Sequence, residues 1–295
     1  MRFGLIGTGH WARIAHAPAL ASTEGITFSG VWGRSPDAAR ELAAEHGSTA
    51  YDDIDDFLAG VDAVAFSVPP DVQAPLATKA AAAGKHLLLE KPVALSTAEA
   101  DALVAAVEGS GVSSVVFFTL MFGSEVRGWI ADVTARQGWL GGTGNWLGTA
   151  MRESDPFNTA WRRAKGGLWD LGPHVISLLW ACLGPVDAVT AMAGPRDVTN
   201  LILRHATATS TATSTVTVTL GAPEPAAGTS VRIWGEPGWS CMPRTSDGTL
   251  PALRTALTEL AANAAAGNPG HPCDVRFGRD IVYVLEEAER QLSKT

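Results

Sequence analysis

The stretch Arg2-Phe3-Gly4-Leu5-Ile6-Gly7-Thr8-Gly9-His10-Trp11-Ala12 decides the fold of this 295-residue chain. Residues 2–6 form a short apolar run that predicts a strand, and the next six residues match G-x-G-x-x-G/A in front of a helical segment, 11–20. In this pattern the first glycine permits a tight turn and the second lets the backbone approach a pyrophosphate, which the helix N-terminus then binds. The stretch predicts a dinucleotide site that includes Gly7, Thr8, Gly9, His10 and Trp11.

Strands and helices alternate over the residues that follow. Strands are expected at 26–32, 61–68, 86–89 and 114–118, and helices at 36–46, 53–59, 71–83 and 96–108. Ser35 and Ser96 are expected N-caps, with Glu99 at the capping-box position. Strands joined by helices imply right-handed crossovers and a parallel sheet. We predict an α/β fold in which residues 1–120 form a doubly wound, Rossmann-type dinucleotide-binding domain.

A second, α+β domain is expected over residues 121–295. Helices are expected at 125–137 and through about residue 183, and two more at 250–266 and 279–293 close the chain. Strand patterns dominate from 186 to about 239, and the alternation of Thr215–Leu220 indicates a sheet with one polar face. We predict a large, mostly antiparallel open sheet, with the C-terminal helix able to pack back on the first domain.

The segment Val31-Trp32-Gly33-Arg34-Ser35-Pro36 bears on the choice of cofactor. An NAD site usually has an acid for the ribose hydroxyls about 20 residues past the glycines. Here a glycine takes that place, which leaves space, and Arg34 and Ser35 follow it with groups suited to a 2′-phosphate. The segment favours NADP over NAD, the alternative being that Arg34 is a solvated loop residue.

Composition and charge exclude several classes of protein. A formal charge of -8 and a pI near 5.3 argue against general affinity for nucleic acid or anionic membranes. Cys182, Cys241 and Cys273 are widely spaced, so neither disulfides nor a metal site is expected, and we expect all three to be buried and inert. The first residues resemble no signal peptide, and the longest apolar run, 175–183, is too short to span a bilayer. We expect a cytoplasmic protein.

Glu90-Lys91-Pro92 follows a predicted buried strand. In open α/β sheets, ligands bind at the carboxyl ends of the strands, so Lys91 is expected to project toward the nicotinamide. The proline restricts the lysine to extended conformations, and an ammonium there can donate to a carbonyl or alcohol oxygen. Pro69 and Glu90 are assigned to the cofactor site on the same ground. The alternative is a surface lysine paired with Glu90.

The stretch Gly166-Gly167-Leu168-Trp169-Asp170-Leu171-Gly172-Pro173-His174 is the second candidate for chemistry. Asp170 and His174 stand four residues apart, a spacing that shares a face where both lie on one helix, and the glycine pair lets backbone approach a ligand. Pro173 is tolerated only in a first helical turn, so Asp170 is expected at or just before the helix start. Trp161 and Arg162, shortly before, are candidates for holding substrate. The alternatives are that the acid and the imidazole cap a helix and bond each other, and that the tryptophans are core residues.

Three motifs together resemble the Gfo/Idh/MocA oxidoreductases, which include glucose–fructose oxidoreductase and inositol dehydrogenase. They are the N-terminal glycine motif, GKHLLLEKPVAL (Gly84–Leu95) and WRR followed by GGLWDLGPH (Trp161–His174). The resemblance implies that Lys91 is catalytic and that Asp170 and His174 contact substrate hydroxyls and assist proton transfer. It also implies a homodimer or homotetramer, associated through the outer face of the second domain's sheet.

Two positions depart from the family pattern. Gln73 stands where many members have a histidine, and Met121 lies where many have an arginine. We predict an NAD(P)-dependent dehydrogenase that transfers a hydride between nicotinamide and a carbinol or carbonyl carbon of a sugar, polyol or related molecule. The alternatives are an NAD-dependent glycosidase of the same fold and a non-catalytic nucleotide-binding regulator. The substrate stays open.

Overall fold

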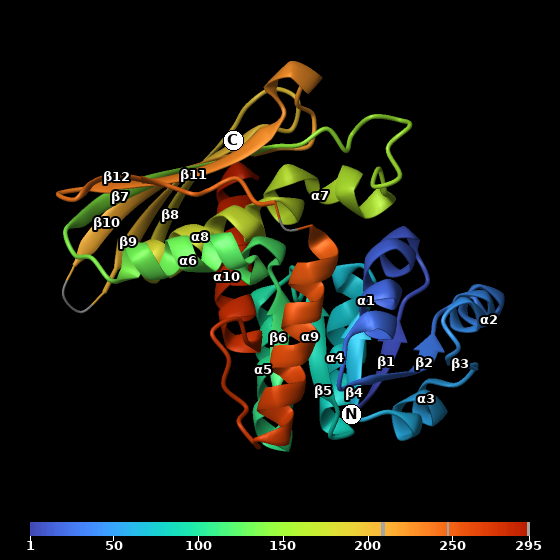
Figure 1. Ribbon diagram of the computed structural model, residues 1–295. Helices are drawn as coiled ribbons and strands as arrows, with labels where there is room; N and C mark the ends of the chain where they lie inside the picture. The colour runs from blue at the N-terminus through green and yellow to red at the C-terminus, as the bar shows by residue number, and fades with distance from the viewer. Residues whose placement is uncertain (208–209, 247, 294–295) are drawn as a thin grey trace. The chain divides into compact units, whose positions relative to one another are not determined.

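The computed structural model describes residues 1–207, 210–246 and 248–293, which form two compact units. The first unit contains residues 1–122 and the described part of 247–282, and the second contains 123–246 and the described part of 283–295. Each unit has a six-stranded sheet (Figure 1). The predicted domain boundary after residue 120 stays a prediction, because compactness alone does not show which segments fold together.

The first sheet is entirely parallel, with strand order β3-β2-β1-β4-β5-β6. Its strands are β1 (Arg2–Ile6), β2 (Thr27–Trp32), β3 (Thr49–Tyr51), β4 (Ala63–Phe66), β5 (His86–Glu90) and β6 (Ser114–Phe117). The chain leaves β1 toward β2 and later crosses to β4 on the other side, which creates the switch point where such sheets bind ligands. The doubly wound prediction is confirmed; β3 was missed because three residues show no alternation.

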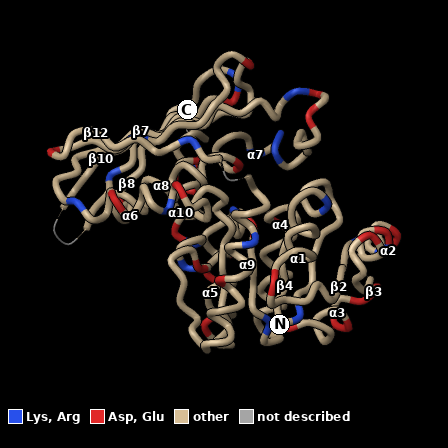
Figure 2. The backbone as a smooth tube through the Cα atoms, viewed as in Figure 1, with Lys and Arg blue, Asp and Glu red and all other residues tan. Residues whose placement is uncertain are grey.

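Four helices connect the later strands: α2 (Pro36–Glu45), α3 (Ile54–Gly60), α4 (Pro70–Ala82) and α5 (Thr97–Ser110). Both predicted serine caps are confirmed, since Ser35 Oγ accepts from Ala38 N at 3.4 Å and Ser96 Oγ from Glu99 N at 3.2 Å. The Glu99 carboxylate reaches back to Leu95 N instead of Ser96 N. Acidic residues gather on α2 and α3 (Figure 2).

The helix after the glycine motif has two parts. A π-helical turn, η1 (Ala12–His16), leads into α1 (Ala17–Ser22), where a single helix over 11–20 was predicted. Pro18 stands at the start of α1. Proline has no N–H, and in a regular α-helix its ring crowds the carbonyl four residues earlier. The wider turn accommodates this proline.

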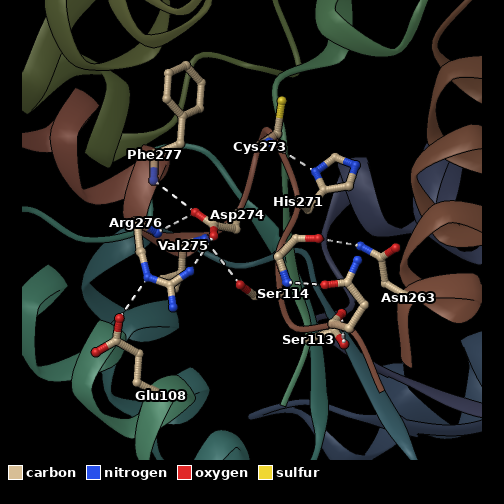
Figure 3. A network of polar contacts seen from close by, with 12 residues as sticks. Glu108, Ser113, Ser114, Asn263, His271, Cys273, Asp274, Val275, Arg276 and Phe277 are labelled. Atoms are coloured by element: carbon tan, nitrogen blue, oxygen red, sulfur yellow. Dashed lines mark hydrogen bonds and ion pairs between the residues drawn. The ribbon is translucent and has the colours of Figure 1, made fainter. Parts of the chain in front are cut away.

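Residues 248–282 cover the free edge of the first sheet at β6. Helix α9 (Thr249–Ala265) packs against α1, β5 and β6. Beyond it, Cys273 O accepts from Val116 N at 2.7 Å. Val275 N donates to Ser114 Oγ at 3.1 Å (Figure 3). Asp274 then caps the helix α10 (Val275–Leu292) by accepting from Arg276 N and Phe277 N. The edge strand is therefore closed to pairing with another chain.

The second sheet has strand order β12-β11-β7-β10-β9-β8. Its strands are β7 (Trp139–Leu147), β8 (Val186–Ala193), β9 (Thr199–Ala206), β10 (Thr211–Thr219), β11 (Gly228–Gly235) and β12 (Gly238–Cys241). Only the β7–β10 pair is parallel among these neighbours within the described ranges. On β10, exposed Thr211, Thr213 and Thr215 alternate with buried residues. The mostly antiparallel sheet with a polar face is confirmed.

Helix α8 (Gly172–Leu183) packs against β7 and β10 of this sheet. A Cβ on Gly144 of β7 would lie 2.3 Å from Val175 Cγ1, so the glycines of β7 let the helix approach closely. The remaining helical segments are α6 (Ser124–Thr134), α7 (Ala160–Asp170), η2 (Thr119–Phe122, first unit) and η3 (Glu224–Ala226). Residues 275–282 of helix α10 belong to the first unit, and the rest of the helix belongs to the second.

One side chain of α10 covers part of the edge of β8. The Gln291 amide accepts from Ala191 N at 3.0 Å and donates to Val189 O at 2.8 Å. It thus occupies the place of a strand partner.

Burial differs among the three cysteines. Cys182 and Cys273 are buried, and burial raises the pKa of the Cys182 thiol to about 12. Cys241 is exposed on the edge strand β12, so the expectation that all three are buried is wrong.

Along the described ranges, every helix falls short of the length and apolar character needed to cross a membrane.

Candidate nucleotide and substrate sites

The turn after β1 requires glycine at one position and leaves open space at another. Gly7 has φ +124°, and a Cβ there would lie 2.3 Å from the backbone oxygen of Ser67. Its N–H donates to Trp32 O at 2.9 Å, which ties the turn to the end of β2. Gly9 is exposed and has no atom within 4 Å of an added Cβ. Only at Gly9 is the backbone open to a ligand, as the dinucleotide pattern requires.

The helix N-terminus beside Gly9 completes a site that fits a dinucleotide. The first helical bond runs from Arg13 N to Gly9 O at 3.1 Å, so the preceding N–H groups lie at the helix start. His10 is exposed there and Thr8 is half-buried. Open backbone at a helix N-terminus is the arrangement that binds phosphate. The residues present therefore fit the pyrophosphate of NAD or NADP.

The residues assigned to a 2′-phosphate lie at the end of β2. A Cβ on Gly33 would lie 2.9 Å from Thr8 Cγ2, so the threonine methyl fills the space that the glycine leaves. Ser35 is engaged as the cap of α2. Arg34 is exposed, and the described part of the chain holds no recorded hydrogen bond or ion pair to its guanidinium. Arg34 is the group at this strand end that is available to an anion.

Glu90, assigned to the cofactor site from sequence, has its carboxylate engaged inside the protein. Trp11 Nε1 donates to its Oε1 at 2.6 Å, and His16 Nε2 lies 2.8 Å from the same oxygen. Lys91 N donates to the other oxygen at 3.3 Å. The His16 side chain is completely buried. Glu90 therefore links the glycine turn and the first helix to the segment that carries Lys91.

The end of β5 is also held by Gln73 from α4. Gln73 Oε1 accepts from Glu90 N at 2.8 Å, and Nε2 donates to Glu90 O at 2.7 Å and to Pro92 O at 3.2 Å. The Lys91–Pro92 peptide bond is cis. Pro69 precedes α4 and accepts from Gln73 N at 2.8 Å, so it helps to fix the helix start. Lys91 itself is partly exposed at the carboxyl end of the parallel strand.

In the second unit, Gly166 and Gly167 lie directly against other protein atoms and leave no open space for a ligand. Gly166 has φ +66° and ψ −168°, which breaks α7, and a Cβ there would lie 2.0 Å from Asp197 Oδ1. A Cβ on Gly167 would lie 2.8 Å from Thr219 Cα. Asp197 Oδ2 accepts from Gly167 N at 2.8 Å and from Leu220 N at 3.1 Å. The pair lets this turn lie against β10, while Asp197 caps it.

Asp170 is buried and paired with Arg162. Arg162 Nε lies 2.8 Å from Asp170 Oδ2, and the carboxylate side chain is only 7% exposed. The guanidinium also donates to Phe157 O at 3.3 Å and lies over the rings of Phe157 and Trp161, 5.2 and 5.6 Å from their centroids. These contacts fix Arg162, which in turn neutralises the carboxylate.

His174 packs on one of the nearby tryptophans, and these tryptophans differ in how far they are exposed. The His174 ring packs on Trp146, with centroids 4.9 Å apart, and is 6% exposed. Trp146 and Trp161 are partly exposed, as a wall for a ligand requires. Trp169 is fully buried with Lys165 Nζ 5.0 Å from its ring, so it is a core residue.

The site residues predicted from sequence fall into two sets. The glycine turn, Arg34, Glu90 and Lys91 belong to the first unit, and Trp161, Arg162, Asp170 and His174 to the second. Within each set the structure brings together residues far apart in sequence. The described residues contain no group of three or more His, Cys, Asp or Glu suited to a metal ion.

Two residues that hold the candidate sites in place, His16 and Asp197, were not predicted from the sequence. His16 gave no signal beyond an isolated histidine in a helix. Asp197 follows Gly194-Pro195-Arg196, a turn-forming cluster that marks a loop but not its distant partner.

Comparison with known proteins matches both parts of the chain. The family model described as an oxidoreductase family with an NAD-binding Rossmann fold matches residues 1–118. The model of the GFO/IDH/MocA C-terminal domain matches residues 131–240.

Individual relatives agree with these matches. Dehydrogenase FPY6 of Fusarium mangiferae is 32% identical over 252 residues, which cover 69% of this chain and 68% of that protein. UDP-N-acetylglucosamine 3-dehydrogenase of Acidithiobacillus ferrooxidans is 41% identical over 104 residues, 35% of this chain and about a third (32%) of that protein. The crystal structure of GenD2 from gentamicin A biosynthesis, in complex with NAD, has a TM-score of 0.83 at 20% identity and covers 99% of this chain and 94% of that one, which shows the same fold. The chain belongs to the GFO/IDH/MocA family of oxidoreductases.

Proposed function

We propose that the chain is an NAD(P)-dependent dehydrogenase acting on a CH–OH group of a sugar, polyol or related small molecule. The observation that carries this proposal is the placement of Lys91. It follows β5 as Gly7 follows β1, and the ends of parallel strands lie on the same edge of the sheet. The Lys91 ammonium, placed beside a dinucleotide-binding turn, can polarise a substrate oxygen. The name of the matching UDP-N-acetylglucosamine 3-dehydrogenase supports a sugar-like substrate.

Lys91 provides the charge at the reacting oxygen. A bound nicotinamide supplies or accepts the hydride. In reduction the Lys91 ammonium donates a proton to the carbonyl oxygen, and in oxidation the neutral Lys91 amine accepts the proton that leaves the hydroxyl. Glu90 and Gln73 hold the backbone on either side of this lysine.

Asp170 and His174 are proposed to orient substrate hydroxyls and to assist proton transfer. Asp170 accepts a hydroxyl hydrogen bond while Arg162, 2.8 Å away, keeps the carboxylate in one position. His174 rests on Trp146, which limits how its ring can turn. Trp161 and Arg162 provide an apolar face and a cation for the rest of the substrate.

We propose NADP as the preferred cofactor, because Arg34 is exposed at the end of β2 and no acid stands in that place. Fluorescence titration tests this. Arg34→Ala is expected to weaken NADPH binding about 10-fold or more, as loss of a charged phosphate contact does, with little change for NADH. Tighter binding of NADH than NADPH by the unaltered chain would contradict the proposal.

We further propose that the protein works in the cytoplasm as a homodimer or homotetramer associated through the open face of the second sheet. Ile202 of β9 is 52% exposed, and its side-chain direction alternates with buried Leu201 and Leu203. Sedimentation of the chain and of Ile202→Glu tests this, since a charge on the covered face should yield monomers.

Substitution of Lys91 tests the proposed function. A panel of sugars and polyols is screened at 340 nm, and Lys91→Met is compared with Lys79→Met, a control on the outer side of α4. Lys91→Met is expected to retain NADPH binding and to lower turnover roughly 10²-fold or more, in line with general acid–base contributions. The control should retain full turnover.

Other outcomes overturn the proposal. Near-normal turnover of Lys91→Met removes the lysine from the mechanism. Cleavage of an aryl glycoside without net change at 340 nm identifies a glycosidase instead. Cofactor binding with no turnover across the whole panel identifies a nucleotide-binding regulator.

A further inference from the structure

The last residue of β5 lacks a strand partner on one side. The pairing of β5 with β4 ends at Ala65 opposite Leu88, while the pairing with β6 continues to Glu90 opposite Phe117. The N–H and C=O of one residue in a parallel strand point to the same neighbour. Both groups of Glu90 point to the β4 side, where that strand has ended, and they would be unsatisfied there without another partner.

One buried side chain supplies the missing partner. Gln73 is fully buried and bonds both backbone groups of Glu90, at 2.8 Å to the N–H and 2.7 Å to the carbonyl. Its Nε2 also bonds Pro92 O at 3.2 Å. The amide therefore holds the residue before Lys91 and the residue after it.

In the second sheet, independently of this one, a glutamine also bonds the edge of a strand, although there it bonds groups of two different residues. Gln291 bonds Val189 O and Ala191 N of the edge strand β8. In both places a glutamine from a helix replaces a short length of strand.

The chemistry explains why an amide occupies position 73. The position requires an acceptor for the Glu90 N–H and a donor for two carbonyls, and a primary amide has both. An ionised carboxylate has only acceptors and would repel the carbonyls, while leucine has neither group. A buried backbone group left unsatisfied destabilises the folded chain. The backbone around Lys91 would move to recover those bonds.

We propose that Gln73 is a positioning residue that fixes the Glu90–Pro92 backbone and thereby the direction of the Lys91 side chain. The inference rests on the proposed catalytic role of Lys91, but the hold on the backbone is testable without it. Gln73 lies outside the reacting groups, because its amide is committed to backbone atoms.

Hydrogen exchange tests the hold directly. Peptides covering 86–95 are compared in the unaltered chain, in Gln73→Leu and in Thr78→Val, a control whose hydroxyl bonds only within α4, to Ala74 O. We expect amide exchange at Glu90 to be at least 10-fold faster in Gln73→Leu, with residues 87–89 unchanged, and no difference in Thr78→Val. Unaltered protection of Glu90 in Gln73→Leu would overturn the inference.

Gln73→Glu separates positioning from general loss of stability. When protonated, the introduced carboxyl has a donor and an acceptor, as the amide does, and when ionised it has acceptors only. Its Glu90 protection and its turnover, each relative to the unaltered chain at the same pH, should therefore recover as the pH falls. In Gln73→Leu, turnover should be lower by about 10- to 100-fold, the effect of a displaced group, at every pH and with NADPH affinity unchanged. A Gln73→Glu variant without this pH-dependent recovery contradicts the proposal.

The two proposals fail in different ways. If Lys91→Met retains turnover, the proposed function is wrong, while loss of Glu90 protection in Gln73→Leu still establishes the hold. If Lys91→Met is inactive but Gln73→Leu retains turnover, the function stands and the positioning role is refuted.

Discussion

The Asp197 contact with the glycine pair yields a graded prediction for stability. Asp197 stands in a left-handed conformation, φ +64°, and its carboxylate accepts from Gly167 N and Leu220 N. Replacement can remove the bonds, the tolerance for this conformation, or both. Asparagine retains an acceptor and tolerates the conformation, glycine retains only the tolerance, and alanine retains neither.

The magnitudes follow from these two effects. Loss of two hydrogen bonds to a half-buried carboxylate costs about 2–3 kcal/mol, and a left-handed alanine adds about 1–2 kcal/mol. We expect losses of about 1 kcal/mol for Asp197→Asn, ~2–3 kcal/mol for Asp197→Gly and ~3–5 kcal/mol for Asp197→Ala. At about 2 °C per kcal/mol, the thermal midpoints should fall by roughly 2, 5 and 8 °C.

Thermal unfolding followed by circular dichroism measures this series. The order is the decisive result, because it separates capping from backbone strain. If Asp197→Gly is as stable as the unaltered chain, the carboxylate hydrogen bonds contribute nothing. If alanine equals glycine, the left-handed conformation carries no cost. Arg196→Gly is a matched control: Arg196 is also left-handed at φ +53° but caps nothing with its side chain, so relief of strain should not lower the midpoint.

Two further predictions concern the nucleotide turn and a buried histidine. Gly9→Ala is expected to change the thermal midpoint by no more than about 1 °C, because nothing lies within 4 Å of the added Cβ. The same variant should bind NADPH about 10-fold or more weakly, and an unchanged NADPH affinity would contradict this prediction. Gly7→Ala, in contrast, should fail to fold stably. His205 bonds Gly184 O and Ser214 Oγ, and burial lowers its pKa below the ordinary 6.5, so the unfolded chain binds the proton first and stability should fall as the pH drops below about 6.5. Urea midpoints from pH 7.5 to 5.5 check this, and His205→Gln should show a smaller fall.

The first unit could be predicted largely from local patterns. The glycine motif and the alternation of apolar runs with capped helices fix strand order and handedness, because βαβ crossovers leave few topologies. The short strands β3 and β12 were missed, since three or four residues carry no period. The π-helical turn was missed because the strain at Pro18 can be relieved in several ways, and only packing selects one.

The candidate site was predictable as a set of residue types but not as a set of contacts. Lys91 and Asp170 stand in recognisable motifs. The residues that hold the neighbouring backbone come from distant segments: Gln73 of α4 bonds Glu90, beside Lys91, and Asp197, thirty residues past the glycine pair, bonds Gly167 N. We expected Gly166 and Gly167 to lie against a ligand. A glycine pair indicates that something comes close to the backbone, but the sequence does not show whether that is a ligand or another part of the protein. Long-range contacts of this kind leave no local pattern.

The glutamine at the edge of β8 has a consequence for association. A strand edge with free N–H and C=O groups recruits strands from other molecules, which leads to fibres or insoluble sheets. Because Gln291 occupies Val189 O and Ala191 N, an incoming strand could not bond these two groups of β8. We expect loss of the final residues of α10 to free both groups and to increase aggregation through β8.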